Sequence, residues 1–124
     1  MMDKQKTEIV RLLKHKQETC ALLLLKMEEQ VQAVNDKDEP RLNMIVAEKD
    51  GLVAELNETD HKIADLAGGL DKATQESLAR ENEELGKWIE ADLETIIKQE
   101  TFCQEKLNFV KSEMLEKIKG VKQG

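Results

Sequence analysis

The chain has 124 residues, of which 36% are charged, and its formal net charge is −7. Only 2% of the residues are aromatic, and there is a single proline. This composition excludes a β-sandwich, which needs many β-branched and aromatic residues, and favours long amphipathic helices. The acidic balance repels phosphate backbones, so we expect no nucleic-acid partner. The length is typical of one domain, which we expect to span residues 1–124.

The first predicted helix ends near Val34. Its apolar residues follow steps of three and four, the spacing of a helical stripe: Val10, Leu13, Cys20, Leu24, Met27, Val31 and Val34. An acidic segment, 35–39, then precedes Pro40, which is tolerated in the first turn of a helix. Asp36 or Asp38 can serve as the N-cap, so a second helix is expected to begin near Pro40.

The second predicted helix runs to Gly68-Gly69. Its stripe includes Ile45 and Leu52, and Lys49 interrupts it, with a stem that can pack while its ammonium reaches water. Glycine is favoured in the left-handed conformation of a helix C-cap, so we expect that conformation at Gly68-Gly69.

The third predicted helical segment starts at an N-cap, Asp71 or Thr74, and continues toward Gly120. It is too long to pair fully with either of the others. We expect it to bend or break near Gly86 and Trp88, where the spacing of apolar residues slips, or near Glu100, which puts a carboxylate on the apolar stripe. The predicted fold is therefore all-α: an antiparallel up-and-down bundle of three long helices, the last one segmented.

Residues that could support catalysis are sparse. Cys20 and Cys103 lie within helical patterns and are expected to be free buried thiols, a disulfide or metal pair being the alternative. His15 and His61 are interpreted as surface residues. We therefore expect no enzyme activity, no catalytic residues, no metal and no cofactor. No signal peptide or apolar run of about 20 residues is present, so we expect a cytoplasmic protein without a membrane span.

The C-terminal segment, 100–124, is the candidate binding region. Both phenylalanines of the chain lie in it, and its apolar residues cover a broad helical face: Phe102, Leu107, Phe109, Val110, Met114, Leu115, Ile118 and Val121. Such a face either completes the intramolecular core or receives an amphipathic helix of another protein.

The sequence also resembles a known family, over about residues 9–66. The similarity rests on Val31 and Val34, the turn Asn35-Asp36-Lys37-Asp38, Leu42 and Ile45, and the run from Glu48 to Leu56. In these features it is similar to the bacterial FlgN family of flagellar export chaperones. The resemblance implies a small cytosolic helical protein that holds hook-associated proteins of the FlgK and FlgL type before type III export. It would assign client binding to the C-terminal apolar face.

Two alternatives stay open. One is a FliT-like chaperone for the filament cap protein, from the same export system. The other is a structural coiled-coil protein that only associates with itself. A homodimer is compatible with each of these hypotheses.

Overall fold

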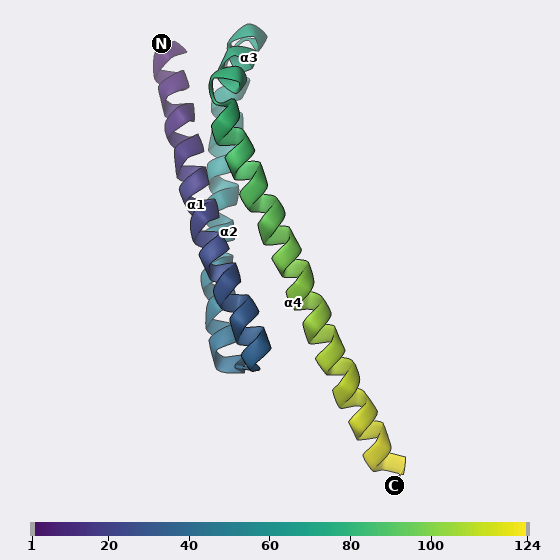
Figure 1. Cartoon of the computed structure of the whole chain (residues 1–124). Helices are drawn as coiled ribbons and strands as arrows, with labels where there is room; N and C mark the ends of the chain where they lie inside the picture. Colours follow the sequence, from purple (N-terminus) through teal and green to yellow (C-terminus); the bar gives the residue numbers. More distant parts are fainter. Residues whose placement is uncertain (1, 124) are drawn as a thin grey trace.

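The structure is a computed structural model that describes the backbone of residues 2–123 and the side chains of residues 4–108 and 114–116. Every element in this part of the chain is a helix, so the fold is all-α: α1 (Met2–Asp36), α2 (Glu39–Gly68), α3 (Lys72–Glu81) and α4 (Glu83–Gln123). Figure 1 shows α1 and α2 as an antiparallel hairpin, with the short α3 at the end opposite its turn. From there α4 runs back along the hairpin and extends past the turn (Figure 1).

The hairpin turn is built on Lys37, whose φ of 56° lies in the left-handed region. The Lys37 amide donates to the Val34 carbonyl at 3.2 Å, and the Asp38 amide donates to the Ala33 carbonyl at 3.0 Å. This pair of bonds is the Schellman arrangement, which satisfies the last carbonyls of a helix. Asp38 then caps α2, because its carboxylate accepts from the Arg41 amide at 3.2 Å. Of the two predicted N-caps, Asp38 is the one used.

The end of α2 differs from the prediction. Gly69 has a φ of −83°, in the right-handed region, so the expected left-handed cap is wrong. The chain instead continues in a right-handed turn in which the Leu70 amide donates to the Ala67 carbonyl at 3.0 Å. That turn carries the Leu70 side chain into the core.

The N-cap of α3 agrees with the prediction. The Asp71 carboxylate accepts from the Thr74 amide at 2.7 Å. Hydrogen bonding from the Thr74 side chain, and then from its backbone amide, stabilises the carboxylate and lowers the pKa of Asp71.

The last segment is divided at Asn82, and α4 passes without interruption through both predicted places, Gly86–Trp88 and Glu100. The Asn82 side-chain amide donates to the Leu78 carbonyl at 2.9 Å. The Asn82 backbone amide donates to the same carbonyl at 3.1 Å, and its φ of −114° and ψ of 22° depart from helical values, so α3 ends at this residue.

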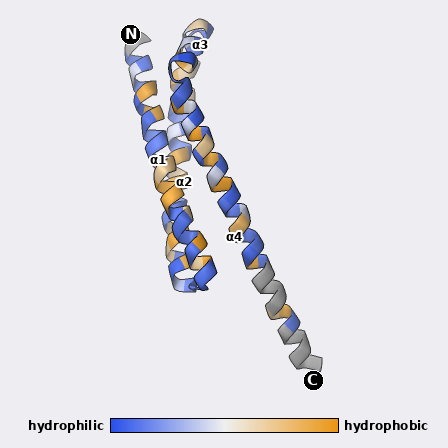
Figure 2. Cartoon of the chain, viewed as in Figure 1, coloured by the Kyte–Doolittle hydropathy of each residue, from blue (hydrophilic) through white to orange (hydrophobic). Residues whose placement is uncertain are grey.

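α1 is the central helix and packs against both α2 and α4, whereas α2 and α4 make few direct contacts with each other. Figure 2 shows the amphipathic pattern behind this packing, with hydrophobic residues spread among hydrophilic ones along α1, α2 and α4. The buried apolar side chains of α1 include Leu12, Leu23 and Met27. They cover a wider face than one stripe, because α1 has two neighbours.

Both cysteines are buried and free, as predicted. Cys20 lies on α1 and Cys103 on α4, each almost fully enclosed. Burial raises the pKa of the Cys20 thiol, because the thiolate would lose its hydration.

Candidate protein-binding surface

The predicted binding residues that can be placed are on the surface of α4. Of their side chains, the following fractions are exposed: Phe102 42%, Leu107 38%, Met114 58% and Leu115 56%. Four further predicted residues, Phe109, Val110, Ile118 and Val121, lie outside the residues whose side chains the structure describes. The described members therefore do not complete the intramolecular core, which was one of the two interpretations of this face.

Leu107 and Met114 open onto a pocket of about 320 Å³ at the turn end of the hairpin. The apolar part of its wall is completed by residues of α1 and α2: Ala33, Val34 and Leu42. Its other lining residues are charged: Lys37, Asp38 and Glu39. An apolar pocket with charged residues around it suits the insertion of an apolar side chain from a helix that also carries charge.

Phe102 and Leu115 do not line this pocket. Phe102 instead has the Lys106 ammonium 5.7 Å from its ring centroid, a cation–π contact at an exposed site. Leu115 follows Met114 directly and is turned by about 100° around the helix axis. The predicted face is thus divided into a pocket-lining part and a flanking part.

Val34 and Leu42 were not predicted to line the site. Both residues belong to apolar helical stripes. Such a stripe predicts that its residues are buried, but it does not predict which other helix they pack against. Their proximity to Leu107 depends on how far α4 runs along the hairpin, which no local signal specifies.

A polar link attaches α4 to the hairpin before the pocket is reached. The Lys49 ammonium on α2 donates to the Gln30 side chain of α1 at 2.8 Å and forms an ion pair with Glu100 of α4. The expectation that this ammonium reaches water is wrong, since only 13% of the Lys49 side chain is exposed. α4 is continuous through Glu100, whose carboxylate lies opposite the Lys49 ammonium.

Burial also affects the charge on Lys49. Loss of hydration lowers the pKa of the ammonium, and neighbouring negative charge opposes the shift. The link joins three helices at one point and adds to the packing of α4 against α1.

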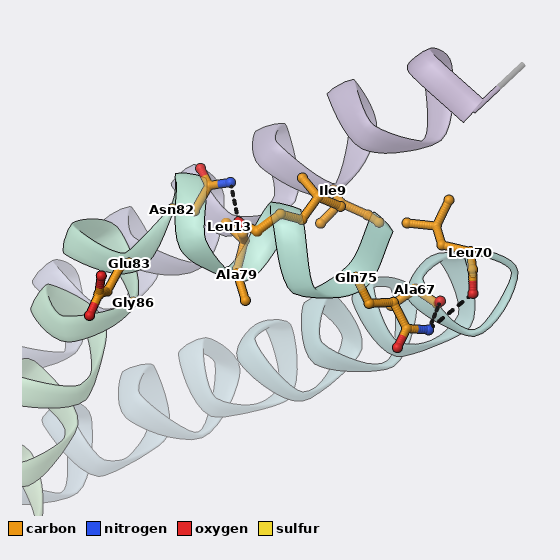
Figure 3. Close-up of a pocket in the computed structure, with 10 residues that line it drawn as sticks. Ile9, Leu13, Ala67, Leu70, Gln75, Ala79, Asn82, Glu83 and Gly86 are labelled. Carbon is orange, nitrogen blue, oxygen red and sulfur yellow. Dashed lines mark hydrogen bonds between the residues drawn. The ribbon is translucent and has the colours of Figure 1, made fainter. Parts of the chain in front are cut away.

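A second cavity, of about 300 Å³, lies at the α3 end of the molecule (Figure 3). Ile9, Leu70 and Leu78 form a buried core cluster there. The Gln75 side-chain amide donates to the Ala67 and Leu70 carbonyls at 2.6 and 3.2 Å, as Figure 3 shows. These bonds hold the connection between α2 and α3 in place, so we assign this cavity to the core rather than to a binding site.

Among the described residues, no group of three or more His, Cys, Asp or Glu side chains could hold a metal ion. None of the described helices has both the length and the apolar character that crossing a bilayer requires. Comparisons with known protein families, with curated proteins and with solved structures gave no match.

Proposed function

We propose that this protein is a non-enzymatic, cytoplasmic flagellar export chaperone that binds hook-associated proteins of the FlgK and FlgL type before type III secretion. The observation that carries the proposal is the exposed apolar surface of α4 beside the pocket at the hairpin turn. The resemblance of residues 9–66 to the FlgN family supplies the class of client. In this proposal α1, α2 and α4 act as an antiparallel up-and-down bundle that presents the surface.

The client would bind as an amphipathic helix. An apolar side chain of the client enters the pocket, where it contacts Leu42, Leu107 and Met114. Phe102 and Leu115 supply further apolar contacts on either side. Lys37 and Asp38 at the pocket offer partners of both charge signs, which would select the charge pattern of the client.

This arrangement fits the requirements of export. The terminal segments of axial flagellar proteins become helical on assembly, and an apolar helix exposed before then is prone to aggregation. A client that folds on binding loses conformational entropy, and this cost keeps the affinity moderate. Moderate affinity permits release when the client is handed to the export apparatus.

The test is capture of purified FlgK-type and FlgL-type proteins by the double variant Leu107→Asp/Val110→Asp. We expect a loss of binding by at least about tenfold, since a carboxylate in an apolar contact costs more than 1.4 kcal/mol. Leu25→Asp is the control, because Leu25 is an exposed leucine on α1 that does not line the pocket. Circular dichroism establishes that both variants remain helical.

Unchanged capture by the helical double variant would overturn the proposal. Binding of the filament cap protein alone would instead assign the chain to the FliT-like class. Concentration-independent self-association without any client would favour the structural coiled-coil alternative.

A further inference from the structure

The first half of α1 carries a basic patch. Residues 4–16 contain five Lys or Arg residues and one Glu, a formal charge of +4, although the whole chain carries −7. Two of the cations already have partners, Arg11 with Glu8 and Lys16 with Asp60. Among the residues whose side chains the structure describes, no carboxylate pairs with the other three cations: Lys4, Lys6 and Lys14. The patch therefore keeps positive charge that the described carboxylates do not neutralise.

A pocket of about 380 Å³ opens within this patch, between α1 and α3. Lys6, Arg11 and Lys14 line it from α1. Val10 and the buried Leu78 supply its apolar lining. Of its described lining residues, only Leu78 is shared with the core cavity at the same end of the molecule. Figure 1 shows the first turns of α1 and the short α3 at this end.

The spacing along α1 suits a helical partner. Lys6, Val10 and Lys14 follow one another in steps of four residues, so they form a single ridge on the helix surface. At 1.5 Å per residue the two lysines are about 12 Å apart along the helix axis, with the valine midway between them. A helix lying along this ridge can place an apolar side chain over Val10 and an acidic side chain four positions to either side of it.

Glu81 determines where the acidic side chains of such a partner can lie. It lines the pocket from α3, and its carboxylate accepts a hydrogen bond from the Ser77 hydroxyl at 3.2 Å. Among the described lining residues it is the one with negative charge. It repels carboxylates on the α3 side of the pocket, so the acidic residues of the partner are expected over α1.

We infer that this pocket docks an acidic amphipathic helix of a partner protein. An apolar side chain of the partner enters the pocket beside Val10, and acidic residues eight positions apart pair with Lys6 and Lys14. These ion pairs are exposed to solvent, so the interaction is weak and weakens further as salt screens it.

Charge and shape both favour a helix over the other anionic partners, nucleic acids and membranes. An extended anionic surface is repelled by a chain with a net charge of −7, whereas a single helix contacts the basic patch alone. The apolar lining, Val10 and Leu78, also offers nothing to a phosphate group but accepts an apolar side chain.

The inference does not depend on the proposed function. The client test alters Leu107 and Val110 on α4, and neither residue lines this pocket. Failure of either test leaves the other unaffected.

The test uses a labelled, alanine-rich helical peptide that carries one Leu with a Glu four positions before it and another Glu four positions after it. A basic peptide with Lys in place of both Glu residues is compared with it. Fluorescence anisotropy is measured as the full chain is added in about 0.05 M salt. The Kd of the acidic peptide should be lower than that of the basic peptide by at least about tenfold.

Two variants of the chain locate the interaction. Lys6→Glu/Lys14→Glu should reverse the preference between the peptides, because the ridge then carries negative charge. Glu81→Gln should tighten binding of the acidic peptide about twofold, because it removes a repulsive carboxylate from the pocket. Circular dichroism establishes that both variants remain helical.

The control is Lys98→Glu/Lys106→Glu, which makes the same change in net charge at exposed positions of α4 outside the pocket and should leave the preference as it is. Replacing the Leu of the acidic peptide by Ala should weaken binding by at least about threefold, since apolar contact in the pocket is lost.

An unmodified chain that binds both peptides alike, or neither, would overturn the inference. So would a control variant that reverses the preference, or an acidic peptide that binds equally well without its Leu. Sedimentation of the chain with vesicles of anionic phospholipid, without a preference for the acidic peptide, would overturn it in favour of a membrane surface.

Discussion

At the scale of single residues, the sequence predicts the helix N-caps well, because an N-cap depends on a hydrogen bond between residues only three positions apart. Asp38 and Asp71 were each one of two predicted N-caps, because a short side-chain oxygen before a helix can reach an amide three residues on, and both do so. Lys37 was not predicted to be left-handed, because lysine has no preference for that conformation. The tight hairpin imposes it, and Gly69, which could have adopted it at no cost, does not.

The conformation of Lys37 gives a stability prediction. Lys37→Gly should raise the free energy of unfolding by about 1 kcal/mol, since glycine adopts a positive φ without the steric cost of a Cβ atom. Urea denaturation measures the change. Lys98→Gly, at an exposed position inside α4, should lower stability by a similar amount. A loss of stability in Lys37→Gly would contradict the account of the turn.

The buried thiol of Cys20 gives a pH prediction. Its pKa is raised above the ordinary value of 9.0 in the folded chain, so above that pH the unfolded chain loses a proton that the folded chain keeps. Ionisation then favours the unfolded state, and this contribution to stability falls as pH rises from about 8 to about 10. In Cys20→Ala the decline in unfolding free energy over this range should be smaller. An equal decline of the unfolding free energy in both proteins would show that folding does not raise the pKa of the Cys20 thiol.

At the scale of helices, apolar spacing predicted the two long helices of the hairpin, while Pro40 and Gly68-Gly69 placed the turn and the end of α2 to within a few residues. It did not predict the break at Asn82, because one residue leaves the helical conformation there without a change in the period of the apolar residues. It also predicted a disturbance at Glu100 that does not occur. The sequence shows a carboxylate on an apolar stripe but not that Lys49, from another helix, will be opposite it.

The link between α2 and α4 can be tested by a pair of variants. Glu100→Ala should lower the unfolding free energy by about 1 kcal/mol, because the buried Lys49 ammonium loses the Glu100 carboxylate as its partner. The loss is no larger because the Glu100 side chain is partly hydrated in the folded chain. Lys49→Met/Glu100→Leu should recover most of that loss, since matched apolar side chains replace a partly buried ion pair at little cost. Thermal unfolding compares the two. A double variant less stable than the single one would mean that the ion pair is a strong net contributor.

At the scale of the whole molecule, the candidate site arises where separate elements meet. Leu107 and Met114 come from α4, while Val34 and Leu42 flank the hairpin turn. The sequence could indicate the C-terminal half of α4, because its apolar residues exceed what a stripe needs. It could not supply the hairpin residues of the pocket, which depend on the path of α4 after the break at Asn82 and on its attachment through Lys49.

The most direct test of the central claim, that a client binds where α4 passes the hairpin turn, is hydrogen exchange measured with and without a bound FlgK-type or FlgL-type protein. The account predicts slower amide exchange in residues 102–116 of α4 and in residues 33–42 around the turn. Residues 70–86, at the α3 end, should exchange as in the free chain. Protection confined to the α3 end, or no protection in 102–116 when binding is saturated, would contradict the account.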